Sequence, residues 1–157
     1  LSGLGYSSVT IGLMWAIGAS AEIIFFICQA PIVRRFSIKV ILMGSLFLAV
    51  VRFALIGFGA ESFIILLIAQ LLHAATFGAH HVTSILSIQK WFAGPLQARG
   101  QALFISASYG VGGTLGGFFL SWIWEDVSPV AVYWVASGFA LIGFFAAWQS
   151  FRWQVQK

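Results

Sequence analysis

Residues 40–59 read VILMGSLFLAVVRFALIGFG, twenty residues with a single charged side chain, Arg52. A helix of about 20 apolar residues is long enough to cross the hydrocarbon core of a bilayer. Four similar stretches lie at about residues 10–33, 62–89, 101–123 and 129–150. Over the 157 residues, 61% are hydrophobic, 8% are charged and the mean hydropathy is +0.99. The sequence therefore predicts an all-α integral membrane protein with five transmembrane helices.

The charged residues between these stretches separate by sign onto two sides. One side carries seven basic residues: Arg34, Arg35, Lys39, Lys90, Arg99, Arg152 and Lys157. The other side carries Glu61, Glu125 and Asp126 and no Lys or Arg. Because basic loops remain in the cytoplasm, we predict that the basic side and the C-terminus are cytoplasmic. Topology also explains the pI of about 9.7, so we expect no nucleic-acid partner.

The start of the chain resembles the end of a helix more than a leader. Residues 1–9 begin with Leu rather than Met and contain no basic-then-apolar signal segment. Five helices would also leave one packing face uncovered. We therefore expect residues 1–157 to be the C-terminal transmembrane domain of a longer protein, with the lipid bilayer and an N-terminal half as its partners.

Two charged residues lie deep in the predicted spans, and they are the first candidates for function. Glu22 lies about 18 Å from the outer end of its helix and shares a face with Gln29, two turns away. A charge at the bilayer centre costs roughly 2.5–3.5 kcal/mol, so such residues usually bind a substrate or an ion. The alternatives are a structural ion pair for Glu22 and, for Arg52, snorkelling towards Glu61 at the rim.

The third span carries the longest polar pattern. Gln70, His73, Phe77, His80, Ser84 and Ser87 follow steps of three and four residues. This spacing predicts one stripe along a helix, which would line water or substrate. His73 lies about 16 Å from the outer end, close to the depth of Glu22. His80 and His81 lie nearer the cytoplasmic end, and an interfacial position is the alternative for both.

Enzymatic and cofactor functions are not expected. All three histidines lie on one helix, so none faces a histidine on another span, as paired haem ligation would require. No His, Asp and Glu cluster has metal-ligand spacing. We predict no catalytic residue, no cofactor and no metal site.

The last two spans carry packing and interface signals. Gly112 with Gly116, and Gly113 with Gly117, form two overlapping G-x-x-x-G pairs that let helix backbones touch, either in static packing or in a sliding contact. The last span is rich in aromatic residues, with Tyr133 near one interface, and we expect it to face lipid.

Residues 90–104, KWFAGPLQARGQALF, and residues 109–117, YGVGGTLGG, together resemble the junction between helices ten and eleven of major facilitator superfamily transporters. The pattern is similar to the branch of 3-phenylpropionate, nucleoside and lactose proton symporters. The resemblance implies that the five spans are helices eight to twelve in a bacterial inner membrane. The loop at residues 31–39 lacks the Asp and Gly usual in the family, so its motif is degenerate.

Lactose-permease-like members carry a carboxylate on helix eight, an Arg on helix nine, and a His followed by a carboxylate on helix ten. Glu22, Arg52 and His73 match this set, whereas Thr76 and Phe77 stand where the second carboxylate would follow. The resemblance implies proton coupling through Glu22 and His73.

From the polar residues of the spans, we expect the substrate path to be lined by Arg52, Gln29, Gln70 and His80. The expected function is proton-coupled uptake of a small organic solute, such as an aromatic carboxylate. The alternatives are symport of nucleosides or sugars, and a non-transporting membrane receptor or assembly protein.

Overall fold

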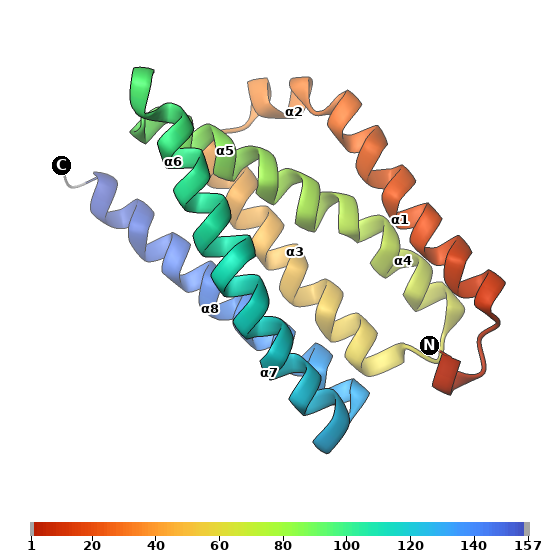
Figure 1. The fold of residues 1–157 in the computed structure, drawn as a ribbon. Coiled ribbons are helices and arrows are strands. Elements are labelled where there is room, and N and C mark those ends of the chain that lie inside the picture. Colours follow the sequence, from red (N-terminus) through yellow and green to blue (C-terminus); the bar gives the residue numbers. More distant parts are fainter. Residues whose placement is uncertain (1, 156–157) are drawn as a thin grey trace.

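The computed structural model describes residues 2–155, which form five long helical spans in an up-and-down arrangement (Figure 1). The spans consist of α1 (Ser8–Cys28), α3 (Ile38–Gly59), α4–η2–α5 (Phe63–His73, Ala74–Gly78, Ala79–Trp91), η3–α6–η4–α7 (Gly94–Leu96, Gln97–Ile105, Ser106–Gly112, Gly113–Asp126) and α8 (Pro129–Val155). Two short helices, η1 (Ser2–Leu4) and α2 (Ala30–Arg35), complete the fold. The predicted all-α membrane fold with five spans is confirmed.

The first span is shorter than the stretch predicted at residues 10–33. It begins after Ser7, whose hydroxyl accepts the backbone N–H of Thr10 at 3.1 Å, and it ends at Cys28. The ring of Pro31 is the physical reason for this end, because proline offers no N–H and clashes with the carbonyl four residues earlier. Gln29 therefore lies at the junction of α1 and α2 rather than inside a continuous helix.

The second span, α3, occupies the centre of the bundle. It packs along α8 on one side and against α4 and α5 on the other, while α1 packs on α4 and η2. The hydroxyl of Ser137 on α8 donates a 3.0 Å hydrogen bond to the carbonyl of Val50 on α3. A Cβ on Gly57 would lie 3.2 Å from the indole of Trp134, so the backbone of α3 lies against that ring. The last span thus packs along the second, and the expectation that it simply faces lipid was too broad.

The third and fourth spans each contain a π-helical segment, η2 and η4. A π-turn closes i to i+5 hydrogen bonds and so holds one more residue than an α-turn. Residues beyond it are shifted by one position around the helix axis relative to those before it. Such segments are frequent at functional sites, and η2 follows directly after His73.

The glycines of the fourth span lie on an open surface of the described chain. A Cβ on Gly113, Gly116 or Gly117 would meet no atom within 4 Å, and one on Gly112 would meet only the carbonyl of Ala107 in its own helix. No helix within residues 2–155 packs against these glycines. Their role in helix packing remains a prediction.

Candidate functional site

A cavity of about 600 Å³ opens between α1, α3, α4 and α8. Glu22, Arg52, Gln70 and His73, all singled out from the sequence, line it together. The structure therefore brings the charged residues of three predicted spans into one site. The volume is within the range of about 300–1,000 Å³ typical of pockets for small ligands.

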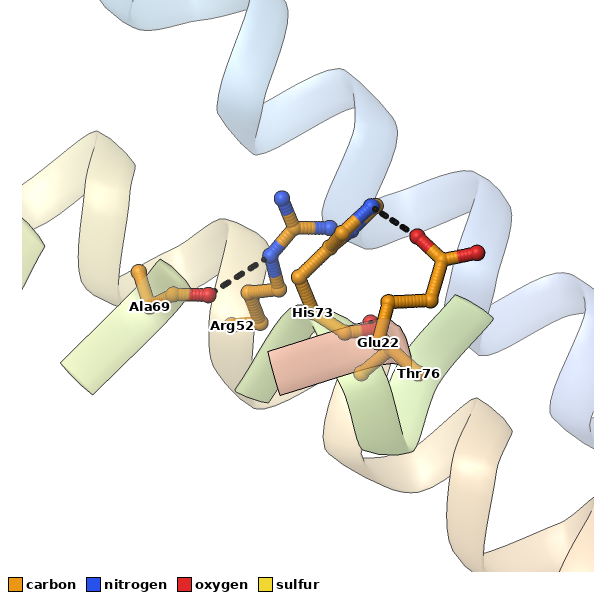
Figure 2. Close-up of polar contacts among 5 residues, drawn as sticks. All are labelled: Glu22, Arg52, Ala69, His73 and Thr76. Carbon is orange, nitrogen blue, oxygen red and sulfur yellow. Dashed lines mark hydrogen bonds and ion pairs between the residues drawn. The ribbon is translucent and has the colours of Figure 1, made fainter. Parts of the chain in front are cut away.

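The carboxyl of Glu22 and the imidazole of His73 meet across the contact of α1 with α4, and they form an ion pair when His73 is protonated. The Glu22 Oε2 to His73 Nε2 distance is 3.5 Å, and the side chains are 21% and 30% exposed (Figure 2). The hydroxyl of Thr76, in the π-segment η2, donates to the backbone carbonyl of His73 at 3.2 Å. The pair is neither sealed in the core nor open on the surface, so a proton or ligand can reach it through the cavity.

Arg52 points into the bundle instead of towards the rim. Its Nε donates a 3.0 Å hydrogen bond to the carbonyl of Ala69 on α4 (Figure 2). The guanidinium carbon also lies 5.3 Å from the centre of the Phe53 ring. Within the described residues, the two terminal nitrogens of Arg52 donate no hydrogen bond to the protein, and they remain for a ligand in the cavity. Snorkelling towards Glu61 is therefore not what this side chain does.

The absence of a side chain at Gly18 gives room to the amide of Gln70 between α1 and α4. A Cβ at this position would lie 2.7 Å from Oε1 of Gln70, so the amide would have to move. Gln70 lies half-buried in the cavity wall, one turn before His73. Gly18 lies one turn before Glu22 on α1 and also lines the cavity.

Gln29 lies away from this cavity. Its amide nitrogen donates to the carbonyl of Phe26 at 3.0 Å, because the chain turns out of α1 at this point. Its Oε1 is buried and has no partner among the described residues. Gln29 keeps α-helical backbone angles at the end of α1 but does not line the cavity, and a role for Gln29 in binding remains a prediction.

The π-segment changes which histidine continues the polar face of the third span. His73, Phe77 and His81 form a stacked column, with ring centres 5.4 Å and 6.2 Å apart and interplanar angles of 20° and 12°. In an unbroken α-helix His80 would follow His73 and Phe77 on this face, but the extra residue of η2 moves His81 there. His80 is half-buried, joins no aromatic pair within residues 2–155 and does not line the cavity. After Phe77, His81 therefore takes the place on this face that the predicted stripe gave to His80.

One tyrosine lines the cavity and a second contacts the ring column that starts at His73, and neither was a sequence candidate for the site. Tyr133 of α8 lines the cavity beside Arg52, although its position near a span end indicated only an interfacial residue. Tyr109, in the second π-segment, lies with its hydroxyl 3.2 Å from Nδ1 of His81. The signal in the sequence for Tyr109 was its position at the start of the glycine-rich segment of residues 109–117.

The groups of the cavity define its chemistry. With Glu22 ionised and His73 neutral, the carboxylate and the guanidinium of Arg52 cancel. A proton on Glu22 would leave a cavity with one uncompensated cation, bordered by the rings of Trp15, Phe53 and Tyr133. Within residues 2–155, no three or more His, Cys, Asp or Glu side chains are grouped so that they could hold a metal ion.

Comparison with known proteins gives two matches. Residues 1–135 match the MFS_1 like family. The probable 3-phenylpropionic acid transporter of Escherichia coli (strain K12) is 28% identical over 141 residues, which cover 90% of this chain and 36% of that protein. The chain therefore spans about a third of the length of this curated relative. No solved structure matches it.

Proposed function

The chain belongs to the MFS_1 like family of the major facilitator superfamily, and from this premise we propose that it is the C-terminal transmembrane part of a proton-coupled secondary transporter. In this proposal a second bundle, from elsewhere in the protein, faces the cavity. Transporters of this architecture bind substrate near the bilayer midplane between two such bundles and expose it alternately to each side. The basic side and the C-terminus would lie in the cytoplasm of a bacterium, with the protein in its inner membrane.

One observation carries the proposal: a single cavity holds a carboxylate, an imidazole and a guanidinium inside helices long enough to span a membrane. A structural ion pair needs no cavity of about 600 Å³ beside it. The 3.5 Å contact of Glu22 with His73 is long for a charge-assisted hydrogen bond, which has a typical length of about 2.7–2.9 Å. The pair is therefore loosely held, as a site that exchanges protons requires.

The coupling step follows from charge balance. A proton that enters the cavity neutralises Glu22 and weakens its attraction for both His73 and Arg52. The free terminal nitrogens of Arg52 can then hold an anion by two parallel hydrogen bonds. Release of the proton on the other side restores the negative charge and expels the anion. Glu22 and His73 would thus couple proton movement to the binding of substrate at Arg52.

We favour a small aromatic carboxylate as the substrate. Arg52 matches the carboxylate, Gln70 adds an amide, and the rings of Trp15 and Phe53 offer apolar surface for an aromatic body. The name of the Escherichia coli relative, a probable 3-phenylpropionic acid transporter, points to the same chemical class. Nucleosides and sugars are the competing substrates, but neither would use the guanidinium as a partner for negative charge.

Proteoliposomes that contain the full-length protein test the coupling. We expect Glu22→Gln to abolish accumulation of 3-phenylpropionate driven by a pH gradient, while exchange of labelled for unlabelled substrate continues. Glu61→Gln is the matched control, because Glu61 lies outside the cavity lining. Uphill accumulation by Glu22→Gln at the rate of the parent would remove Glu22 from the mechanism. Absence of any flux from the parent would favour a receptor or assembly role.

The same system tests the substrate class. Arg52→Lys keeps the charge but loses the two-point geometry, so we expect about a 10- to 100-fold rise in the apparent KM for aromatic acids, as loss of one charged hydrogen bond implies. Arg99→Lys, at an exposed basic position, should leave KM unchanged. Transport of uncharged nucleosides or sugars by the parent, with no transport of carboxylates, would contradict the proposed substrate.

A further inference from the structure

A second site lies at the basic end of the bundle, far along the helices from Glu22 and Arg52. A cavity of about 280 Å³ is formed there by the start of α3 and the ends of α5 and α8. Figure 1 shows the end of α5 and the C-terminal end of α8 at the same end of the bundle. Lys39 and Lys90 both line this cavity, with the hydroxyls of Ser37 and Ser87 and the amide of Gln154.

Within residues 2–155 the two lysines have no anionic partner. The four acidic side chains of the 157 residues are Glu22, in the first span, and Glu61, Glu125 and Asp126, at the opposite ends of the helices. Within residues 2–155 neither lysine forms an ion pair, and the Nζ of Lys39 instead lies 5.9 Å from the centre of the Phe151 ring. Among the described residues, the lining of the cavity thus combines two ammonium groups with neutral hydrogen-bonding groups and contains no carboxylate.

An apolar cavity of about 180 Å³ continues from this site towards the middle of the membrane. The two cavities share Ser87, Trp91, Phe151 and Gln154. Beyond these residues the wall becomes apolar, with Leu42, Ile88, Phe104 and Ala147 among its lining. A cationic pocket that leads directly into an apolar groove fits a molecule with an anionic head and a hydrocarbon tail.

We propose that this site binds an anionic phospholipid, with its phosphate between Lys39 and Lys90 and the start of an acyl chain along the apolar groove. Basic pockets between transmembrane helices are suited to lipid phosphates, and aromatic residues such as Trp91 are favoured at the level of the headgroups. The groove distinguishes the lipid from a soluble phosphate, which would leave the apolar walls empty. A zwitterionic lipid fits less well, because its own ammonium group would approach the two lysines.

The test is native mass spectrometry of the full-length protein in detergent, titrated separately with phosphatidylglycerol, phosphatidylcholine and deacylated glycerophosphoglycerol. At micromolar concentrations we expect phosphatidylglycerol to bind, and we expect no binding of phosphatidylcholine or glycerophosphoglycerol. Cations near an anionic lipid contribute about fivefold in affinity each, so the double variant Lys39→Gln with Lys90→Gln should bind about 30-fold more weakly. The double variant Lys39→Arg with Lys90→Arg keeps both charges and should retain binding.

The matched control removes two other positive charges from the same end of the bundle. Arg34 and Arg35 lie on α2 and line neither cavity, so their double replacement by Gln should change the affinity less than threefold. Equal losses in the two Gln variants would refute a defined site, since net charge alone would then explain the binding. Equal affinity for phosphatidylcholine would refute charge recognition, and equal affinity for glycerophosphoglycerol would refute the role of the groove.

Discussion

Replacement of Gly78 by alanine tests the packing that positions Glu22. Gly78 is buried in the π-segment η2, and a Cβ there would lie 2.7 Å from Cδ1 and 3.2 Å from Cε1 of Phe25 on α1. A ring edge cannot bend away as the end of a flexible chain can, so α1 or η2 must move. Glu22 lies one turn before Phe25, and the movement would therefore lengthen its 3.5 Å contact with His73.

The magnitude follows from two opposing terms. Overpacking of a filled interface costs about 1–3 kcal/mol, whereas exchange of glycine for alanine inside a helix gains about 1 kcal/mol. We expect Gly78→Ala to lower the free energy of unfolding by up to about 2 kcal/mol. When Phe25→Ala removes the ring first, the same substitution should become neutral or stabilise the protein by about 1 kcal/mol. The coupling energy between the two sites is thus about 1–3 kcal/mol.

Unfolding in mixed dodecylmaltoside and SDS micelles, followed by the helical circular dichroism signal, measures these differences. Gly138→Ala on α8 is the control, because its Cβ would meet no atom within 4 Å and only the gain in helix propensity should remain. The reasoning is wrong if Gly78→Ala costs the same free energy with and without the Phe25 ring.

Three further predictions follow from single contacts. Gly18→Ala should leave stability within about 0.5 kcal/mol of the parent, because the amide of Gln70 can swing away, but it should raise the apparent KM for substrate in uptake assays; an unchanged KM would contradict the role of Gln70 in the cavity. Ser137→Ala should lower the free energy of unfolding by about 0.6 kcal/mol, the average for hydrogen bonds between membrane helices. A variant more stable than the parent would contradict the contribution of the bond from Ser137 to Val50. In a Cys28→Ser background, Ala60→Cys and Val127→Cys should react with impermeant thiol reagents from outside intact cells; labelling only after disruption of the membrane would reverse the proposed topology.

Hydropathy sufficed to predict five spanning helices, because a bilayer imposes a minimum helix length. The meeting of Glu22, Arg52 and His73 was also predictable. Each is an expensive polar residue in a different span, and the depths of Glu22 and His73 follow from a constant rise per residue.

The errors lie where the helix departs from a regular period. Periodicity assumes 3.6 residues per turn, so the π-segment η2 placed His81 where the sequence predicted His80. Pro31 was visible in the sequence, but the predicted span ran through it, whereas α1 ends at Cys28. Tyr133 was missed because residues near the end of an aromatic-rich span look interfacial whichever way they point.

The π-segment after His73 also has a meaning for how this chain could have arisen. One residue added to an α-helix rotates everything that follows by about 100° and advances it by about 1.5 Å. Here η2 confines that change to five residues, Ala74–Gly78, so the contacts of α5 with α3 and α6 need not be rebuilt. An insertion of this kind lengthens the span while it leaves His81 and the rest of α5 in place. Deletion of Ala75 should therefore keep the same histidine on this face, and relatives with one residue fewer in this turn are expected to present the histidine that corresponds to His81.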